Sequence, residues 1–106
     1  MTIISITPDK EKAKSIFKMV KKTIEMIDSL DKEKFPSHVM KQYYDVIREL
    51  SSIILLLDGY KTTGTGAHKQ LIEYIDENYP QLTEHNIVFM NRLRKLRNRI
   101  SYDGFF

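Results

Sequence analysis

Apolar residues recur at three- and four-residue intervals along most of the chain, which is the spacing of one face of an α-helix. The first such segment covers about residues 9–31, and lysines fill its other side. Thr7 is the expected N-cap, with Pro8 at the first helical position. The recurring apolar positions are Ala13, Ile16, Phe17, Val20, Ile24, Ile27 and Leu30.

A second helix is predicted over about residues 37–58, after the break at Phe35 and Pro36. Ser37 is its expected N-cap, and Gly59 is expected to end it in the left-handed conformation. The last two turns of this helix are apolar on nearly every side. Such a helix lies either at the centre of a bundle or against a partner subunit.

Two further helices are predicted after a turn-rich loop at residues 61–67. One covers about residues 68–79 and stops at Pro80, and the other covers about residues 83–103 and stops at Gly104. The expected core stripe of the last helix consists of Phe89, Leu93, Leu96 and Ile100. The pattern therefore predicts an all-α, four-helix up-down bundle.

The composition is that of one globular domain, residues 1–106, with 42% hydrophobic and 29% charged residues. The absence of cysteine excludes disulfides and cysteine-based metal sites. The longest aliphatic run, residues 53–57, is far shorter than the ~20 apolar residues that span a bilayer, and no secretory signal is visible. We expect a soluble cytoplasmic protein without a cofactor or a membrane contact. Strand-like character is confined to residues 2–6.

The net charge of +3 lies entirely in the last part of the chain. Residues 1–83 contain 12 basic and 12 acidic side chains, whereas residues 84–106 contain five basic side chains against two acidic ones. This distribution argues against a polycationic packaging protein and favours one local basic surface. Its members are Arg92, Arg94, Lys95, Arg97 and Arg99.

The basic segment has the composition of a nucleic-acid contact. No acidic residue lies between Arg92 and Tyr102, so the cations repel one another by a few tenths of a kcal/mol per pair, which a bound polyanion would relieve. Asn98 and Tyr102 stand among the cations, which suits contact with phosphates and bases. The alternative interpretation is a solvated basic helix face.

Two segments resemble a known family. Leu96-Arg97-Asn98-x-x-x-Tyr102, followed by Asp103 and Gly104, resembles the Arg-polar-x(3)-His motif of HEPN domains, whose name abbreviates "higher eukaryotes and prokaryotes nucleotide-binding". Residues 57–68 (LDGYKTTGTGAH) resemble the connection between the second and third helices of small prokaryotic members. The resemblance covers most of the chain and implies an up-down bundle that dimerises, so that two copies of the motif share a cleft.

The resemblance also implies a function. Many HEPN domains are metal-independent endoribonucleases, often toxins encoded beside a small nucleotidyltransferase. By the resemblance, Arg97 would bind the scissile phosphate and stabilise the charge of the transition state. Asn98 would orient the site, and Tyr102 stands where the family usually has histidine. The remaining cations, expected to bind nucleic acid, are Arg92, Arg94, Lys95 and Arg99.

Tyrosine at position 102 leaves two functions open. Imidazole exchanges protons readily near pH 7, whereas tyrosine, with a usual pKa of ~10, is a poor base. One function is that of a HEPN toxin component with endoribonuclease activity at a dimer cleft. The other is a non-catalytic HEPN module that binds RNA or nucleotide, or docks a nucleotidyltransferase or other partner protein. Since Arg97 and Tyr102 lie about 140° apart around an ideal helix, we expect them to converge only if the helix ends between them or a partner subunit supplies one.

His68 is an auxiliary candidate at the start of the third helix, where the helix dipole would lower its pKa and keep it neutral. The alternative is a loop histidine that fixes the turn. His38 and His85 have no ligand-forming neighbours in sequence, so no metal site is predicted. Gly64 and Gly66 lack a following Gly-Lys-Ser/Thr and are expected to permit a tight reversal rather than bind a nucleoside triphosphate.

Overall fold

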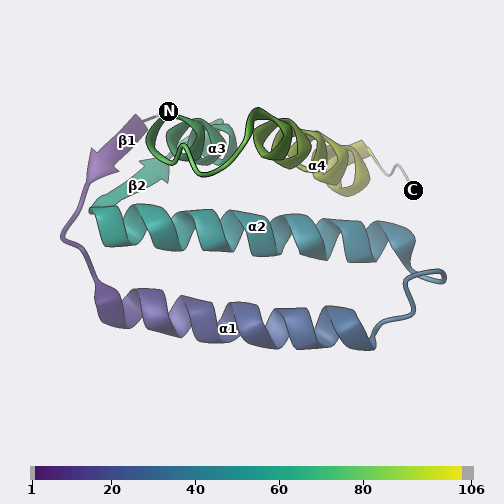
Figure 1. Cartoon of the computed structure of the whole chain (residues 1–106). Helices are drawn as coiled ribbons and strands as arrows, with labels where there is room; N and C mark the ends of the chain where they lie inside the picture. The colour runs from purple at the N-terminus through teal and green to yellow at the C-terminus, as the bar shows by residue number, and fades with distance from the viewer. Residues whose placement is uncertain (1, 104–106) are drawn as a thin grey trace.

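The computed structural model describes residues 2–103 and is mostly helical (Figure 1). Its elements are β1 (Thr2–Ser5), α1 (Lys10–Ser29), α2 (Pro36–Asp58), β2 (Tyr60–Thr63), α3 (Ala67–Asn78) and α4 (Glu84–Asp103). Each of the four predicted helices is confirmed to within two residues at both ends. The periodicity of apolar residues is therefore a sufficient guide to where the helices lie.

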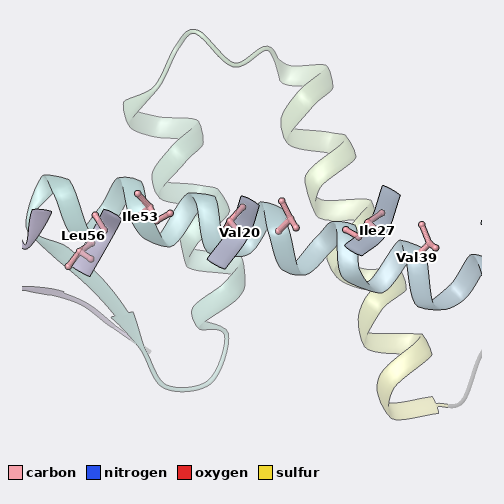
Figure 2. Close-up of a cluster of buried hydrophobic side chains, with 7 residues drawn as sticks. Val20, Ile27, Val39, Ile53 and Leu56 are labelled. Atoms are coloured by element: carbon pink, nitrogen blue, oxygen red, sulfur yellow. The ribbon is translucent and has the colours of Figure 1, made fainter. Parts of the chain in front are cut away.

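Helix α2 is the middle layer of the molecule (Figure 1). Helix α1 runs antiparallel to it on one side, and α3 and α4 pack on the other side. Within the described residues, α1 contacts neither α3 nor α4. Both α3 and α4 cross α2 steeply rather than running along it (Figures 1 and 2). The up-down arrangement therefore holds for α1 and α2, while the second pair of helices lies across them.

Buried apolar side chains form one cluster on each side of α2, which explains why its last turns are apolar all round. Toward α1, buried residues recur every seven positions on both helices, so that two rows face each other along the helix pair (Figure 2). The rows consist of Ala13, Val20 and Ile27 on α1 and of Val39, Val46 and Ile53 on α2, and Leu56 adds to the cluster near the end of α2. The second cluster joins α2 to α3 and α4 through Leu55, Leu71, Ile72, Ile75, Ile87 and Met90.

The first part of the expected loop at residues 61–67 is a strand. β2 pairs antiparallel with β1, with Thr2 opposite Thr63 and Ser5 opposite Tyr60. A strand was expected at residues 2–6, but none was expected at β2. β2 has only four residues and lacks the alternation of buried and exposed side chains that identifies a strand in a sequence. Its conformation depends on a partner strand more than fifty positions earlier in the chain, which the local pattern could not show.

Two N-caps differ from the prediction. Asp9, rather than Thr7, caps α1, because its carboxylate accepts a hydrogen bond from the Lys12 N–H at 3.0 Å. Phe35, rather than Ser37, is the N-cap residue of α2 and makes no side-chain cap, since Pro36 occupies the first helical position.

Gly59 ends α2 as predicted, with a φ of 87°. Its carbonyl accepts a hydrogen bond from the Ile6 N–H at 2.8 Å, so the turn also fixes the start of the chain against the end of α2. A Cβ at this position would lie 3.2 Å from the Ile6 carbonyl oxygen. The predicted stop of α4 at Gly104 lies outside the described residues.

Helix α4 turns a different stripe toward the core from the one predicted. Leu93 is buried as expected, but Phe89 is 53% exposed, and Ile87 and Met90 are buried in its place. Leu96 and Ile100 are only half-buried. The inward stripe continues along the helix with the half-buried side chains of Arg94, Arg97 and Ser101. This rotation brings two arginines of the basic segment against the rest of the fold.

Candidate nucleic-acid interface

A pocket of about 360 Å³ lies between the start of α3 and the C-terminal half of α4, hereafter the α3–α4 pocket. Gly64 and Gly66, with φ values of 81° and 79°, turn the chain into α3 so that residues 64–69 form one wall. Arg94, Asn98 and Tyr102 form the other wall. They are spaced four residues apart, and side chains at this spacing share one side of a helix.

The lining of the α3–α4 pocket is suited to an anion. Its ionisable cations are Lys69 and Arg94, and no carboxylate is among the residues that line it. The first turn of α3 also lies at the pocket, and the unpaired N–H groups at a helix start attract negative charge. The Tyr102 ring is 76% exposed and presents an aromatic face at the rim.

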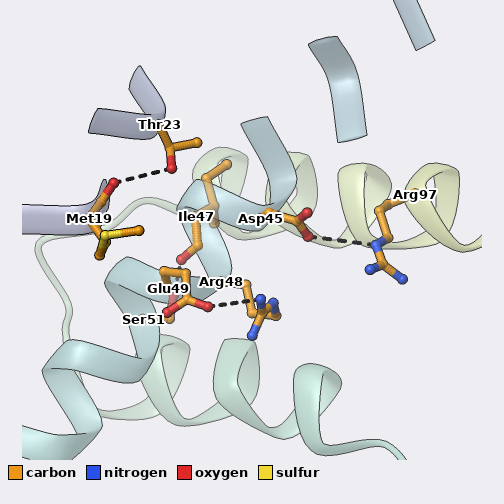
Figure 3. A network of polar contacts seen from close by, with 8 residues as sticks. All are labelled: Met19, Thr23, Asp45, Ile47, Arg48, Glu49, Ser51 and Arg97. Atoms are coloured by element: carbon orange, nitrogen blue, oxygen red, sulfur yellow. Dashed lines mark hydrogen bonds and ion pairs between the residues drawn. The ribbon is translucent and has the colours of Figure 1, made fainter. Parts of the chain in front are cut away.

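Arg97 lies deeper than these residues and does not line the pocket. Its side chain is 19% exposed, and its Nε lies 3.6 Å from Oδ1 of Asp45 on α2 (Figure 3). This distance is that of an ion pair without a hydrogen bond, and both atoms are buried with no hydrogen-bond partner. Its Cζ lies 6.0 Å from the centre of the Tyr102 ring.

The contact between Arg97 and Tyr102 corrects the prediction that a helix end or a second subunit must bring them together. α4 is continuous from Glu84 to Asp103, and both side chains belong to the same chain. The angle of about 140° describes where the side chains leave the helix. An arginine side chain is long enough to bend around the helix and reach the ring, where it makes a cation–π contact.

His68 lies in the α3–α4 pocket near three arginines and the buried Tyr44, whose ring centre is 6.2 Å away. Burial lowers the pKa of His68, and the positive charges of Arg48, Arg97 and Arg94 lower it further. The predicted direction of the pKa shift is confirmed, but burial rather than the helix dipole is its main cause. Burial also raises the pKa of the Tyr44 phenol, which keeps it protonated.

The outer face of α4 carries the other cations of the basic segment. Arg92, Lys95 and Arg99 are exposed and do not line the α3–α4 pocket. The seven predicted site residues of α4 are thus divided among three places: the pocket, the ion pair with Asp45, and the outer face. Of these, only the pocket brings residues of α3 and α4 together.

Three residues of α2 contribute to the site although the sequence did not suggest them. Asp45 pairs with Arg97, and Arg48 pairs with Glu49 through an N···O distance of 2.9 Å (Figure 3). The Tyr44 ring lies near His68. The available signal was a group of charged side chains in the middle of a helix that is otherwise largely apolar.

No protein-family model matches the chain, and no curated protein or solved structure is significantly similar to it. Among residues 2–103, no three His, Asp or Glu side chains gather into a group that could hold a metal ion. None of the helices in the same range combines the length and apolarity needed to cross a membrane.

Proposed function

We propose that the protein binds RNA or a nucleotide at the α3–α4 pocket. The observation that carries this proposal is a concave surface lined by two cations and the start of a helix, without a carboxylate. Lys69 and Arg94 would neutralise phosphates, and Asn98 would hydrogen-bond to a sugar or base. The exposed Tyr102 ring would stack on a base, as aromatic residues do in single-strand binding proteins.

We infer that the protein acts as a HEPN-type module, as a homodimer beside a nucleotidyltransferase partner in a toxin–antitoxin-like pair. The resemblance of residues 96–102 to the HEPN motif supports this assignment. Asn98 and Tyr102 of the motif line the pocket, whereas Arg97, the motif residue expected to bind phosphate, contacts Tyr102 and pairs with Asp45. Two copies of the basic helix in one dimer would double the local positive charge.

Cleavage of the bound RNA is a second candidate function. In metal-independent cleavage, the 2′-oxygen attacks the phosphorus, a base accepts the 2′-hydroxyl proton, and an acid protonates the departing 5′-oxygen. Neutral His68 would be the base, Tyr102 the acid, and Arg97 would stabilise the charged transition state. Binding alone is the better-supported function, because Asp45 holds Arg97 outside the pocket.

Fluorescence anisotropy with a labelled single-stranded RNA tests the binding function. We expect Arg94→Ala to weaken binding by about tenfold and to reduce the dependence of log Kd on log salt concentration by about 0.7, the value of one phosphate contact to a single strand. Lys22→Ala is the matched control, because it removes one exposed cation from α1, away from the pocket. Equal effects of the two variants, or no binding by the wild type, would refute a site at the α3–α4 pocket.

Incubation of pure protein with RNA in EDTA tests cleavage. Products that appear with the wild type and disappear with Arg97→Ala are the result expected of an endoribonuclease. Intact RNA in both reactions, together with saturable binding, would leave the non-catalytic module as the function.

A further inference from the structure

A second pocket, of about 330 Å³, lies between α1 and α2 and is hereafter the α1–α2 pocket. Its apolar part comes mainly from α1 and consists of Ile16, Met19, Val20 and Val46. Its polar lining comes mainly from α2, through Gln42, Asp45, Arg48 and Glu49, and α1 adds Thr23 (Figure 3 shows all of these but Gln42). Pockets that combine an apolar surface with a few convergent polar groups are typical of small-molecule sites.

A single side chain, Arg97, connects the α1–α2 pocket with the α3–α4 pocket. Its Nε is 3.6 Å from Oδ1 of Asp45, which lines the first pocket. Its Cζ is 6.0 Å from the ring of Tyr102, which lines the second. Arg97 lines neither pocket itself, but it contacts one lining residue of each.

The two pockets differ in charge. The α3–α4 pocket has cations and no carboxylate, which suits an anion. The α1–α2 pocket has two carboxylates and one arginine, and both carboxylates already have a cationic partner: Asp45 pairs with Arg97, and Glu49 pairs with Arg48. Its charge is therefore nearly balanced, which does not favour a free anion but suits an uncharged group with hydrogen-bond donors and acceptors.

One polar group in the wall is unsatisfied. Nε of Arg48 is buried and has no hydrogen-bond partner, although Nη2 of the same guanidinium forms an ion pair with Glu49. Leaving a buried donor unpaired is unfavourable, and in native proteins such groups are usually paired once a ligand or water is bound. Side chains of Arg48 and Glu49 are 28% and 36% exposed, so a ligand can reach the pair.

We propose that the α1–α2 pocket binds a nucleobase and prefers guanine, an inference that rests on the proposed nucleotide-binding function. Guanine carries two adjacent donors, N1–H and the N2 amine, which match a carboxylate such as Glu49. It also carries the acceptors O6 and N7, which match the guanidinium of Arg48 and the amide of Gln42. The faces of the base would pack on the apolar side chains of α1. The phosphate of the same nucleotide would then lie toward Arg97 and the α3–α4 pocket.

Isothermal titration of the full chain with GMP, AMP, CMP and UMP tests this proposal. We expect GMP to bind about tenfold more tightly than UMP, which corresponds to about 1.4 kcal/mol. Glu49→Gln and Gln42→Ala should reduce this preference to less than threefold. Glu25→Gln, which makes the same charge change at an exposed position of α1 outside both pockets, should leave it unchanged. Circular dichroism verifies that each variant is folded, and Gln42→Ala tests the pocket without disturbing the Arg48–Glu49 pair.

Different results would refute the proposed base site and the proposed phosphate site. Equal affinity for all four nucleotides, insensitive to Gln42→Ala and Glu49→Gln, would overturn the base site while phosphate binding stands. In Arg94→Ala, we expect all four affinities to fall by a similar factor and the order among the bases to persist. If that variant instead abolished the preference for guanine, the base would be bound at the α3–α4 pocket. The assignment of the base to the α1–α2 pocket would then be wrong.

Discussion

If the protein binds RNA as proposed, the ion pair between Arg97 and Asp45 should limit its affinity for RNA while stabilising its fold. Asp45→Asn removes the negative charge and keeps the size of the side chain. Arg97 already contacts Tyr102, and without its anionic partner on α2 it would be free to extend into the α3–α4 pocket. We therefore predict opposite effects on stability and on RNA affinity from one substitution.

The distance and the burial set the expected magnitude. Two unit charges 3.6 Å apart attract by about 4–5 kcal/mol at an effective dielectric constant of ~20. Much of this attraction offsets the desolvation of the two groups, which are 19% and 26% exposed, and the pair lacks a hydrogen bond. We expect Asp45→Asn to lower the free energy of unfolding by about 1–2 kcal/mol and the Tm by about 4–8 °C.

The RNA affinity of the same variant should increase. One additional arginine–phosphate contact contributes about 1 kcal/mol, or about fivefold in Kd. The dependence of log Kd on log salt concentration should steepen by about 0.7, because one more phosphate is neutralised by a cation. Urea unfolding followed by circular dichroism measures the stability, and anisotropy with labelled RNA at several salt concentrations measures the binding.

Asp28→Asn is the matched control, since Asp28 is exposed on α1 and lines neither pocket. An equal gain in RNA affinity from both variants would mean that long-range charge, rather than release of Arg97, is responsible. Weaker RNA binding by Asp45→Asn would mean that Asp45 orients Arg97 for its ligand, and would refute the competition between carboxylate and phosphate.

Three further predictions concern stability. Gly59→Ala should cost about 1–2 kcal/mol in urea unfolding, because the φ of 87° is strained for alanine and its Cβ would crowd a carbonyl oxygen. Because the pKa of His68 is lowered in the fold, its protonation favours the unfolded state, so the stability should fall as the pH decreases below the usual value of ~6.5 in the wild type but less so in His68→Asn. The hydroxyls of Tyr74 and Tyr79 both donate a hydrogen bond to Oδ2 of Asp58, at 2.8 and 2.5 Å. Replacing both tyrosines by phenylalanine should therefore lower the Tm, and each single replacement should lower it less.

The helices could be predicted from the sequence because their periodicity is local. The rows of α1 and α2 repeat every seven residues and meet in the structure as the pattern requires. The inward face of α4 could not be predicted in this way, because apolar residues occupy more than one of its sides. Ile87 and Met90 face the core instead of Phe89, and this choice depends on how α4 crosses α2 and α3. The pairing of β2 with β1 is likewise a contact between distant parts of the chain.

The candidate site was predictable to the extent that it lies on one helix. Arg94, Asn98 and Tyr102 are four residues apart, and such spacing places them on one side of α4 wherever the helix packs. The partnership of Arg97 with Asp45 was not predictable, because 52 positions separate the two residues and the contact follows from the crossing of α4 over α2. Periodicity gives the side of a helix on which a residue lies, and only packing decides what meets it.

The position of Arg97 bears directly on the choice between binding and cleavage. A phosphate in the α3–α4 pocket meets Arg94 and Lys69 without any rearrangement, so binding requires nothing that the free structure lacks. Cleavage requires a third cation at the scissile phosphate, and Arg97 must leave Asp45 to supply it. This exchange replaces one anion beside Arg97 with another, but it leaves Asp45 without its cationic partner, since Arg48 is paired with Glu49. The cost of this exchange falls on the proposed cleavage and not on the proposed binding, so the geometry favours binding among the two proposed functions.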